Sequence, residues 1–426
     1  MDIFQKLLKN DCMQQIKMIY NTDEKGSKAY TDRLITLIKT YSTVFHDNIT
    51  EGIRIFSAPG RTEIGGNHTD HQRGCVLAAG VNLDIVAAVK PNDSDIIKIK
   101  SDGYDMICID LKQLEQNKQE EGTTLSLVKG IAAYFIKLGY NIKGFNAVMT
   151  SNVLKGSGLS SSAAFEVLVG TILNSLYCNN EQSAIQIAQI GQYAENVYFG
   201  KPCGLMDQMA SSVGSFVAID FKNTQQPKVE QIPFDFAAVH HALCIVDTGG
   251  NHADLTPDYA AVTAEMKSIA AFFGKEVLSE LSENDIYQNI SALRQKCGDR
   301  AILRAIHFFA DSHKAVQEAE ALKNNNFETF KKLVLSSGIS SSTCLQNVYS
   351  TSNTQEQGLS LALALCQKIL ADKGAYRVHG GGFAGTIQAF VPMELLDTFH
   401  NEMEAAFGKG KCYILSIRPV GGIEIV

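Results

Sequence analysis

The sequence has 426 residues, of which 45% are hydrophobic and 19% are charged, and its formal net charge at pH 7 is −7. These proportions are typical of globular proteins with a large buried core, and the length suits about two or three domains. The acidic balance argues against a nucleic-acid-binding protein, which would need a basic face. It leaves open an anionic substrate, because local fields can differ from the total charge.

The cysteine pattern and the first residues indicate a cellular compartment. The ten cysteines are scattered, without a Cys-x-x-Cys pair or a Cys/His cluster at zinc spacing. The opening MDIFQKLLKND lacks a signal-peptide core, and no uncharged apolar run reaches the roughly 18 residues of a membrane span. We therefore expect a cytoplasmic protein with reduced, buried thiols. We expect no nucleic-acid or membrane partner, and a monomer is favoured.

The first third of the chain combines helices, strands and one very polar turn. Helices are predicted at 3–8 and 33–41, without assigned chemistry, and a strand at 53–58 that ends at Pro59-Gly60. Residues 61–71 then hold one Arg, one Glu, one Asn, two His and one Asp. Such donors and acceptors suit a hydroxyl-rich molecule such as a sugar. A solvated loop, or a zinc site from His68, Asp70 and His71, stays open as an alternative.

A glycine-rich turn that leads into a helix is the second notable stretch. Strands are predicted at 75–89, 96–99 and 145–150 with a helix at 126–138, an α/β or α+β pattern. The turn at 155–162, KGSGLSSS, precedes a predicted helix at 163–177, and its three serines offer N-cap hydroxyls. Free N–H groups and the helix dipole at such a turn suit a phosphate. An ordinary capped helix is the alternative.

The remaining chain supplies two carboxylates and a third glycine-rich turn. Glu195 lies late in a predicted helix at 183–198, and Asp207 stands where another helix begins, where a carboxylate can equally be a dipole partner. Strands are predicted at 213–220 and 242–247, and a domain boundary is expected near 210–220. Further predictions are an exposed loop at 113–122, a helix at 355–373, two strands joined by a triple-glycine turn at 376–391, and final strands at 413–426.

Three stretches together resemble the signature motifs of the GHMP small-molecule kinases, and their wording is closest to that of galactokinases. They are residues 59–71, residues 156–164 with 204–208, and residues 380–385. Ala-Pro-Gly-Arg followed by Ile-Gly-Gly-x-His-Thr-Asp looks like the galactokinase sugar-binding signature. The resemblance covers roughly 53–425 and implies an α+β fold of two domains, 1–215 and 216–426. It also implies a left-handed βαβ unit in the first domain and an active site between the domains.

The resemblance further implies a sugar 1-kinase that uses ATP and Mg²⁺, with galactose as the best single substrate. Asp207 would accept the proton of the anomeric hydroxyl, and Arg61 would stabilise the transferring phosphoryl group. The sugar set would be Glu63, Asn67, His68, Asp70, Gly204 and Tyr259. ATP would bind Gly156, Ser157, Gly158, Leu159, Ser160, Ser161 and Ser162. Mg²⁺ would be held by Glu195 and one of the three serines, taken as Ser161. Gly380–Gly382 would close the site near the phosphates.

Departures from the family pattern lie on the sugar side. The family usually has Asn, Glu and Tyr where this chain has Glu63, Asn67 and His71, and Ala260-Ala-Val replaces Asn and arginines after Tyr259. The family glutamate at position 67 contacts a sugar hydroxyl. Hydrogen bonds to charged groups contribute about 1.5–3 kcal/mol and neutral ones about 0.5–1.5, so galactose affinity is expected to fall about tenfold.

Two alternative functions follow from these departures. One is a 1-kinase for another sugar, such as N-acetylgalactosamine or arabinose. The other is a galactokinase-like sugar sensor without turnover. The complete serine turn, together with Arg61 and Asp207, argues against the sensor.

Overall fold

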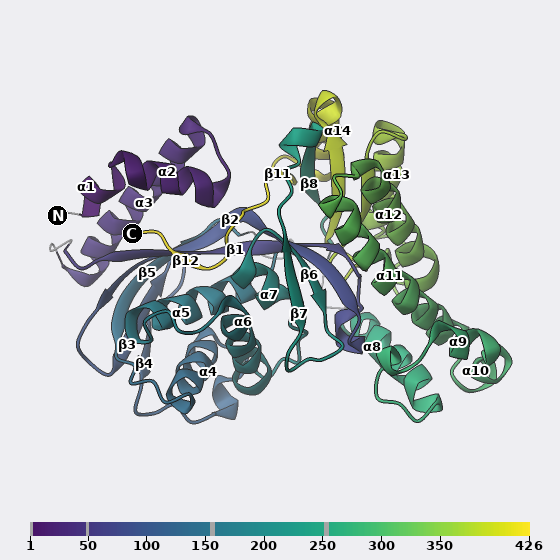
Figure 1. The fold of residues 1–426 in the computed structure, drawn as a ribbon, viewed down its shortest axis with the longest axis horizontal. Helices are drawn as coiled ribbons and strands as arrows, with labels where there is room; N and C mark the ends of the chain where they lie inside the picture. The colour runs from purple at the N-terminus through teal and green to yellow at the C-terminus, as the bar shows by residue number, and fades with distance from the viewer. Residues whose placement is uncertain (1–2, 48–50, 154–157, 251–254) are drawn as a thin grey trace.

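The computed structural model describes residues 3–47, 51–153, 158–250 and 255–426, and two β-sheets organise it (Figure 1). Within these ranges, the first sheet has eight strands in the order β12-β1-β2-β5-β3-β4, with β6 on β2 and β7 on β6. The second sheet has four strands in the order β11-β8-β10-β9. The long strands β1 and β2 run across the molecule and join its two halves.

Antiparallel pairing dominates the first sheet. Only the described pair β3–β5 is parallel, and α4 (Thr124–Lys137) lies in the connection between these strands. The handedness of this crossover stays a prediction. The strands are β1 (Arg54–Gly65), β2 (Cys75–Pro91), β3 (Ile96–Ser101), β4 (Ile107–Asp110), β5 (Phe145–Ser151), β6 (Phe216–Asp220), β7 (Lys228–Ile232) and β12 (Ile423–Glu424).

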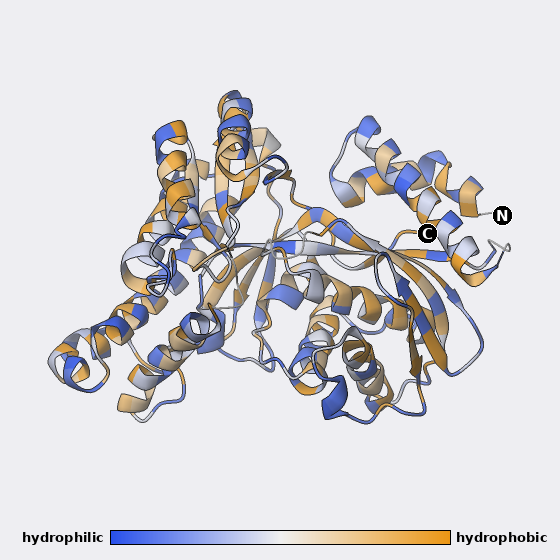
Figure 2. Cartoon of the chain, turned by 180° about the vertical axis from the view of Figure 1, so that it is seen from behind, coloured by the Kyte–Doolittle hydropathy of each residue, from blue (hydrophilic) through white to orange (hydrophobic). Residues whose placement is uncertain are grey.

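Helices cover both faces of the first sheet. On β2, Ala87 and Val89 face the larger core, whereas Val86 and Ala88 face a second core, as the period of two along a strand requires. The larger core includes residues of α4, α5 (Ser161–Tyr177) and α6 (Ala184–Tyr193), with α7 (Met206–Val213) beside them. The second core contains α1 (Ile3–Leu7), α2 (Asn10–Tyr20) and α3 (Glu24–Phe45). Hydrophobic residues accordingly dominate these strands in Figure 2.

The second sheet lies between two helical layers. It consists of β8 (His241–Asp247), β9 (Ala375–His379), β10 (Thr386–Pro392) and β11 (Cys412–Leu415). One face packs on α13 (Gly358–Leu370) and α14 (Leu396–Phe407). The other face shares the larger core with α11 (Asp299–Lys323) and α12 (Phe327–Ser340), so this core spans both sheets. A separate helical cluster holds α8 (Thr256–Phe272), α9 (Glu283–Gln288), α10 (Ile290–Lys296) and part of α11.

Strand β1 differs from its prediction in a way that builds the site. It does not end at Pro59-Gly60 but continues to Gly65, with register shifts at Pro59/Arg61 and Glu63/Gly65. Proline has no N–H for the ladder, so an irregularity there is the expected outcome. A Cβ on Gly60 would lie 2.9 Å from the Leu159 carbonyl oxygen, so glycine lets the phosphate turn approach the strand.

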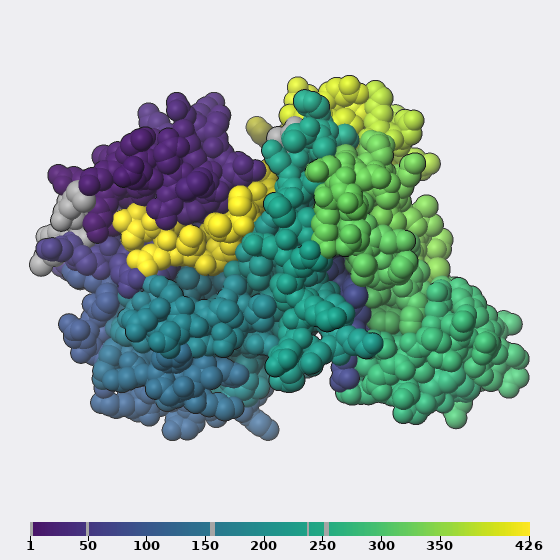
Figure 3. Space-filling view, in the orientation of Figure 1, coloured from purple at the N-terminus to yellow at the C-terminus, as the bar shows by residue number. Residues whose placement is uncertain are grey.

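Strand pairing does not follow the predicted domain boundary. Strands β6 and β7, which lie beyond residue 215, belong to the first sheet, and β12 returns to it and pairs with β1. Judged by strand pairing alone, the chain passes from the first sheet to the second between Ile232, where β7 ends, and His241, where β8 begins. In Figure 3 the C-terminal residues (yellow) run directly beneath the N-terminal helices (purple). The division at 215/216 stays a prediction.

Other expectations about the chain are met in part. All ten cysteines are free thiols, but not all are buried, because Cys108 is exposed. In the described part of the chain, every helix is too short or too polar to cross a lipid bilayer. Residues 113–122 are mostly exposed, as predicted, although a 3₁₀ turn forms at Lys118–Glu120.

Candidate active site

One guanidinium joins the first two motifs of the sequence. The Nε and Nη2 atoms of Arg61 donate to the two carboxylate oxygens of Asp207 at 2.7 and 2.6 Å. The Nη1 atom of Arg61 donates to the carbonyl of Gly158, in the phosphate turn. Arg61 is only 7% exposed, so this two-bond ion pair is shielded from water on its arginine side. The structure therefore brings together the two predicted catalytic residues and the turn predicted to bind phosphate.

Local structure explains how these groups meet. The backbone N–H of Arg61 donates to the Leu159 carbonyl at 3.0 Å, which fixes strand β1 against the turn. Asp207 lies in the first turn of α7, where the helix dipole favours a carboxylate. The Ser160 side chain also hydrogen-bonds Asp207. Strand, turn and helix therefore converge on a single carboxylate.

The electrostatics keep Asp207 ionised. Burial raises the pKa of its carboxyl group, but the charge and hydrogen bonds of Arg61 outweigh burial, and the pKa lies below its usual value. The Asp207 side chain is still 32% exposed, so it is open to a ligand. An ionised, accessible carboxylate beside a buried arginine can accept a proton from a neighbouring hydroxyl.

The phosphate turn lies partly outside the described residues, which exclude Gly156 and Ser157. Ser160 is the N-cap of α5, but the prediction of a capping hydroxyl is wrong, since its side chain makes no cap hydrogen bond. Ser160 has φ +53, a left-handed conformation, and its side chain serves Asp207 instead. Ser160, Ser161 and Ser162 are half-buried, and Gly158 is exposed. A helix start without a side-chain cap suits an anion.

Glu195, the predicted metal ligand, lies in a buried acidic cluster. It belongs to the π-helical turn η3 (Ala194–Phe199) and is 4% exposed. Lys201 donates to one of its oxygens at 3.3 Å, and the Gln208 amide donates to the other at 2.8 Å. The same amide donates to Glu166, which is a buried acid. Among the described residues the second Glu166 oxygen has no hydrogen-bond partner, and burial raises the pKa of the carboxyl group well above its usual value.

The chemistry of this donor set fits Mg²⁺, because hard oxygen ligands suit that ion. Within the described ranges, no three His, Cys, Asp or Glu side chains gather as a metal site. That finding is compatible with an ion held by one carboxylate and substrate phosphates. It also gives no support to a zinc site at His68, Asp70 and His71.

The predicted sugar residues lie against the third motif. The Asn67 amide donates to the Gly380 carbonyl at 2.7 Å, and the His68 Nε2 atom lies 2.9 Å from the Gly381 carbonyl oxygen. The Tyr259 hydroxyl donates to the Gly382 carbonyl at 2.8 Å. Three side chains predicted to bind sugar thus bind three consecutive carbonyls of the glycine turn. The turn is thereby joined to the sugar loop, and the expected role of Gly380–Gly382 in closing the site near the phosphates stays a prediction.

Asn67 and Glu63 are less accessible than a direct sugar contact requires. Asn67 is 0% exposed and Glu63 is 5% exposed. Both hydrogens of the Asn67 amide are used, by Gly380 and by the Glu63 carboxylate at 2.7 Å. Burial raises the pKa of Glu63 to about 7, against the opposing charge of Arg377. In this structure the two side chains contact each other rather than open space.

Asp70 and Gly204 form the more open part of the predicted sugar side. A Cβ on Gly204 would lie 1.8 Å from an Asp70 carboxylate oxygen, so the carboxylate rests directly on the glycine backbone. Burial, followed by the charge of Asp207, raises the pKa of Asp70 to about 6. Burial lowers the pKa of His68 to about 4 and that of His71 to about 3, so both rings are neutral at pH 7.

Two residues that the sequence interpretation did not single out occupy central positions. Gln208 bridges Glu166 and Glu195, and Arg377 is 0% exposed and contacts Glu63. A signal existed for both. Gln208 stands in the Met-Asp-Gln motif, and Arg377 is a single arginine within the apolar 376–391 stretch.

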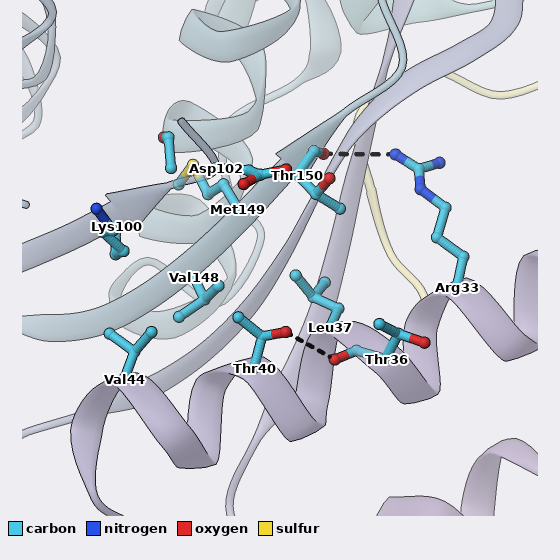
Figure 4. A pocket seen from close by; sticks show the side chains of 11 residues that line it. Arg33, Thr36, Leu37, Thr40, Val44, Lys100, Asp102, Val148, Met149 and Thr150 are labelled. Carbon is cyan, nitrogen blue, oxygen red and sulfur yellow. Dashed lines mark hydrogen bonds between the residues drawn. The ribbon is translucent and has the colours of Figure 1, made fainter. Parts of the chain in front are cut away.

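A cavity elsewhere in the molecule contains none of the predicted site residues. It measures about 330 Å³ and lies between α3 and strands β3 and β5 (Figure 4). Its walls carry Arg33 and Thr40 from the helix and Lys100 and Met149 from the strands. Arg33 is already paired with the buried Asp84 at 2.5 Å.

Comparisons with known proteins agree with this geometry. The family model "GHMP kinases N terminal domain" matches residues 126–215, and the model "Galactokinase galactose-binding signature" matches residues 39–91. The galactokinase of Streptomyces coelicolor is 30% identical over 354 residues, 83% of this chain and 88% of that protein. The galactokinase of Bacillus subtilis is 27% identical, over 84% of this chain and 90% of that protein.

Solved structures show the same fold. Lactococcus lactis galactokinase, crystallised with galactose, superposes with a TM-score of 0.78 at 24% identity, over 92% of this chain and 99% of that chain. Mevalonate kinase of L. major superposes with a TM-score of 0.58 at 16% identity, over 87% and 97% of the two chains. Because the S. coelicolor relative is 30% identical over 83% of this chain and 88% of its own length, this chain belongs to the galactokinase family of sugar kinases.

Proposed function

We propose that this protein transfers the γ-phosphoryl group of ATP to the anomeric hydroxyl of a sugar, and that the sugar is galactose. The observation that carries the proposal is the two-bond Arg61–Asp207 pair, which is held against the Gly158 carbonyl of the phosphate turn. Phosphoryl transfer depends on positioning and charge stabilisation more than on covalent chemistry. A carboxylate, a guanidinium and a helix start without a side-chain cap supply these needs.

Asp207 would act as the proton acceptor. Its lowered pKa keeps it ionised at neutral pH, and it is the partly exposed member of the ion pair. A loose transition state needs the hydroxyl proton removed only late, so a weak base suffices if it is well placed. Arg61 would keep Asp207 oriented and stabilise the charge that develops on the transferring group.

ATP would place its phosphates on the turn at 156–162. The half-buried serines and the backbone N–H groups at the start of α5 support this role. Glu195 and Ser161 would hold Mg²⁺, which supplies neutralisation of phosphate charge when bound. Lys201 and Gln208, which now contact Glu195, are the groups that would adjust around the ion.

Asn67 supports a second candidate, a 1-kinase for another sugar. Its amide is buried and engaged by protein groups, so it offers less to galactose than the family glutamate would. A substrate panel of galactose, N-acetylgalactosamine and arabinose, with ATP consumption as the readout, decides between the candidates. Turnover of galactose above the blank and above the other sugars is expected. If only another sugar reacts, the galactose assignment is wrong.

A sugar sensor without turnover is tested with Asp207→Asn. The amide cannot accept the proton, so kcat should fall by about 10²–10⁴-fold while sugar binding persists. Asp285→Asn is the matched control, because Asp285 is a half-buried carboxylate in the capping box of a short helix outside the site. Wild-type protein that binds galactose and ATP yet releases no ADP would exclude the kinase.

A further inference from the structure

The acid and the amide of the sugar loop stand in reverse order relative to the family motif. This chain has Glu63 and Asn67, whereas the galactokinase motif that it resembles has Asn and then Glu at these positions. In the structure the two side chains are partners, since the Asn67 Nδ2 atom donates to a Glu63 carboxylate oxygen at 2.7 Å. Exchanging two side chains in contact keeps one acid, one amide and the net charge of the pair. The two departures are therefore one coupled change.

Arg377 determines which member of the pair is the acid. Its Nη2 atom lies 3.2 Å from the Glu63 carboxylate, and its Nη1 atom donates to the Ile64 carbonyl at 2.8 Å. Arg377 is 0% exposed, so its charge needs a nearby carboxylate. Loss of one member of a buried ion pair leaves the other charge uncompensated. The acid at position 63 is thus fixed by strand β9, far from it in the sequence.

The surroundings of Asn67 require an amide rather than an acid. Its two Nδ2 hydrogens go to Glu63 and to the Gly380 carbonyl, and its Oδ1 atom accepts from the Asn347 amide at 2.8 Å. A carboxylate in this place would turn oxygen lone pairs toward both the Glu63 carboxylate and the Gly380 carbonyl. Such buried repulsion disfavours an acid at 67 as long as an acid remains at 63.

The pair lies at the base of the sugar loop and can set its position. The Asn67 N–H donates to the Asp311 carboxylate at 2.8 Å, and its carbonyl oxygen lies 2.9 Å from the His307 Nε2 atom, both on α11. The next residue, His68, has φ +57 and contacts the glycine turn. A shift of Asn67 would therefore move His68 and, through the loop, Asp70.

We propose that Glu63 and Asn67 act as a coupled pair of positioning residues that holds the sugar loop against the glycine turn, and that neither works without the other. The inference rests on the proposed function, since it concerns the sugar site of that reaction. The groups left to contact the sugar are then His68, Asp70 and the catalytic pair of Arg61 and Asp207. The contact that an acid at position 67 would make with a sugar hydroxyl is absent.

A double-mutant cycle tests the proposal with wild type, Glu63→Asn, Asn67→Glu and the double variant, which restores the family order. Each single change should raise the sugar KM about tenfold, as loss of a buried hydrogen bond to a charged group predicts, and change the ATP KM less than about twofold. The double variant removes the acid–acid repulsion but leaves Arg377 without its carboxylate and the Gly380 carbonyl without its donor, so it should recover only part of the loss, with a rise in sugar KM clearly smaller than the product of the two single rises. Single variants with an unchanged sugar KM, or a double variant as poor as the product of the singles, overturn the proposal.

Asp84→Asn is the matched control. Asp84 is a buried acid that is paired with Arg33 and Arg418, outside the site. Its replacement should lower the melting temperature and leave the sugar KM unchanged. An equal rise of the sugar KM in this variant would indicate a general effect of buried charge and would count against the pair.

Wild-type turnover separates the two proposals. If no sugar of the panel reacts, the proposed function fails, and the melting temperatures of the four proteins then decide about the pair. A loss in the double variant that is smaller than the sum of the two single losses supports coupling, and strictly additive losses overturn it. If a sugar other than galactose reacts, the cycle is measured with that sugar.

Discussion

The phosphate side and the sugar side of the site are built in opposite ways. On the phosphate side, Ser160–Ser162 are half-buried, and the start of α5 has no side-chain cap. On the sugar side, Asn67 is 0% exposed and Tyr259 uses its hydroxyl on the glycine turn. The phosphate side offers half-buried hydroxyls at a helix start, whereas the sugar side uses its donors to hold the protein together. We therefore expect phosphate affinity to depend on the start of α5, and sugar selection to depend on how the hydrogen-bonded network is placed.

The carboxylates of the two sides also differ, because their pKa values are shifted in opposite directions. Arg61 outweighs burial and keeps the pKa of Asp207 below its usual value, whereas burial raises the pKa of Glu63 to about 7 despite Arg377. Asp207 is ready to take a proton because it is charged. Burial makes the charged form of Glu63 unfavourable. Its side chain is therefore suited to holding neighbouring protein groups rather than to accepting a proton from a substrate.

Arg61→Lys would test the phosphate side most severely. A lysine offers a single point charge and cannot bind both Asp207 oxygens and the Gly158 carbonyl, so kcat should fall by roughly 100- to 1,000-fold. Arg294→Lys is the control, because Arg294 makes a similar two-bond pair with Asp299 on the exposed surface. Steady-state kinetics with saturating ATP and sugar give the answer, and a loss below about fivefold would contradict the role of Arg61.

Glu63→Gln would test the buried acid of the sugar side through the pH dependence of the free energy of unfolding. The folded-state pKa of Glu63, about 7, lies above its ordinary value of 4.5. Stability from this group is therefore fully present below pH 4.5 and is lost as pH rises through 7, by up to about 3 kcal/mol. The variant lacks this titration, so relative to wild type it should gain unfolding free energy between pH 5 and pH 8. Urea unfolding at both pH values measures the gain, and a pH-independent difference would refute it.

Gly204→Ala would test the open part of the sugar side. Its added Cβ would lie 1.8 Å from an Asp70 oxygen, so the carboxylate must move, and the sugar KM should rise about tenfold with a smaller change for ATP. Gly170→Ala, where a Cβ would meet only the flexible Ile187 side chain at 3.0 Å, is the control. Equal changes in the KM values for sugar and ATP would show that Asp70 is not specific to the sugar side.

Tyr259→Phe should have the smallest effect. It removes the hydroxyl that donates to the Gly382 carbonyl and leaves the ring, which packs edge-on against Phe383. Loss of one neutral hydrogen bond predicts about a threefold fall in kcat/KM for sugar. Tyr287→Phe, on an exposed tyrosine, should have none. A fall beyond about thirtyfold would mean that the hydroxyl contacts a substrate directly.

The sequence predicted the chemistry of the site better than its geometry. The phosphate turn was predicted from its glycines and serines, whereas the roles of Arg61 and Asp207 came from the resemblance to the GHMP kinases, and the structure joins these groups. The burial of Asn67 was not foreseen, since its partners Asn347 and Gly380 lie about 300 residues away and leave no local pattern. The continuation of β1 through Pro59-Gly60 was also missed, because proline and glycine normally signal the end of a strand.

The pairing of β12 with β1 has a consequence for synthesis in the cell. Arg54 and Glu424 are 370 residues apart, yet they form an ion pair, and Ile55 exchanges backbone hydrogen bonds with Val426 and Ile425. A ribosome must therefore complete residues 423–426 before the strand that carries Arg61 gains its second neighbour. Until then the nascent protein presents an unpaired strand edge, which is open to aggregation and is a natural substrate for chaperones.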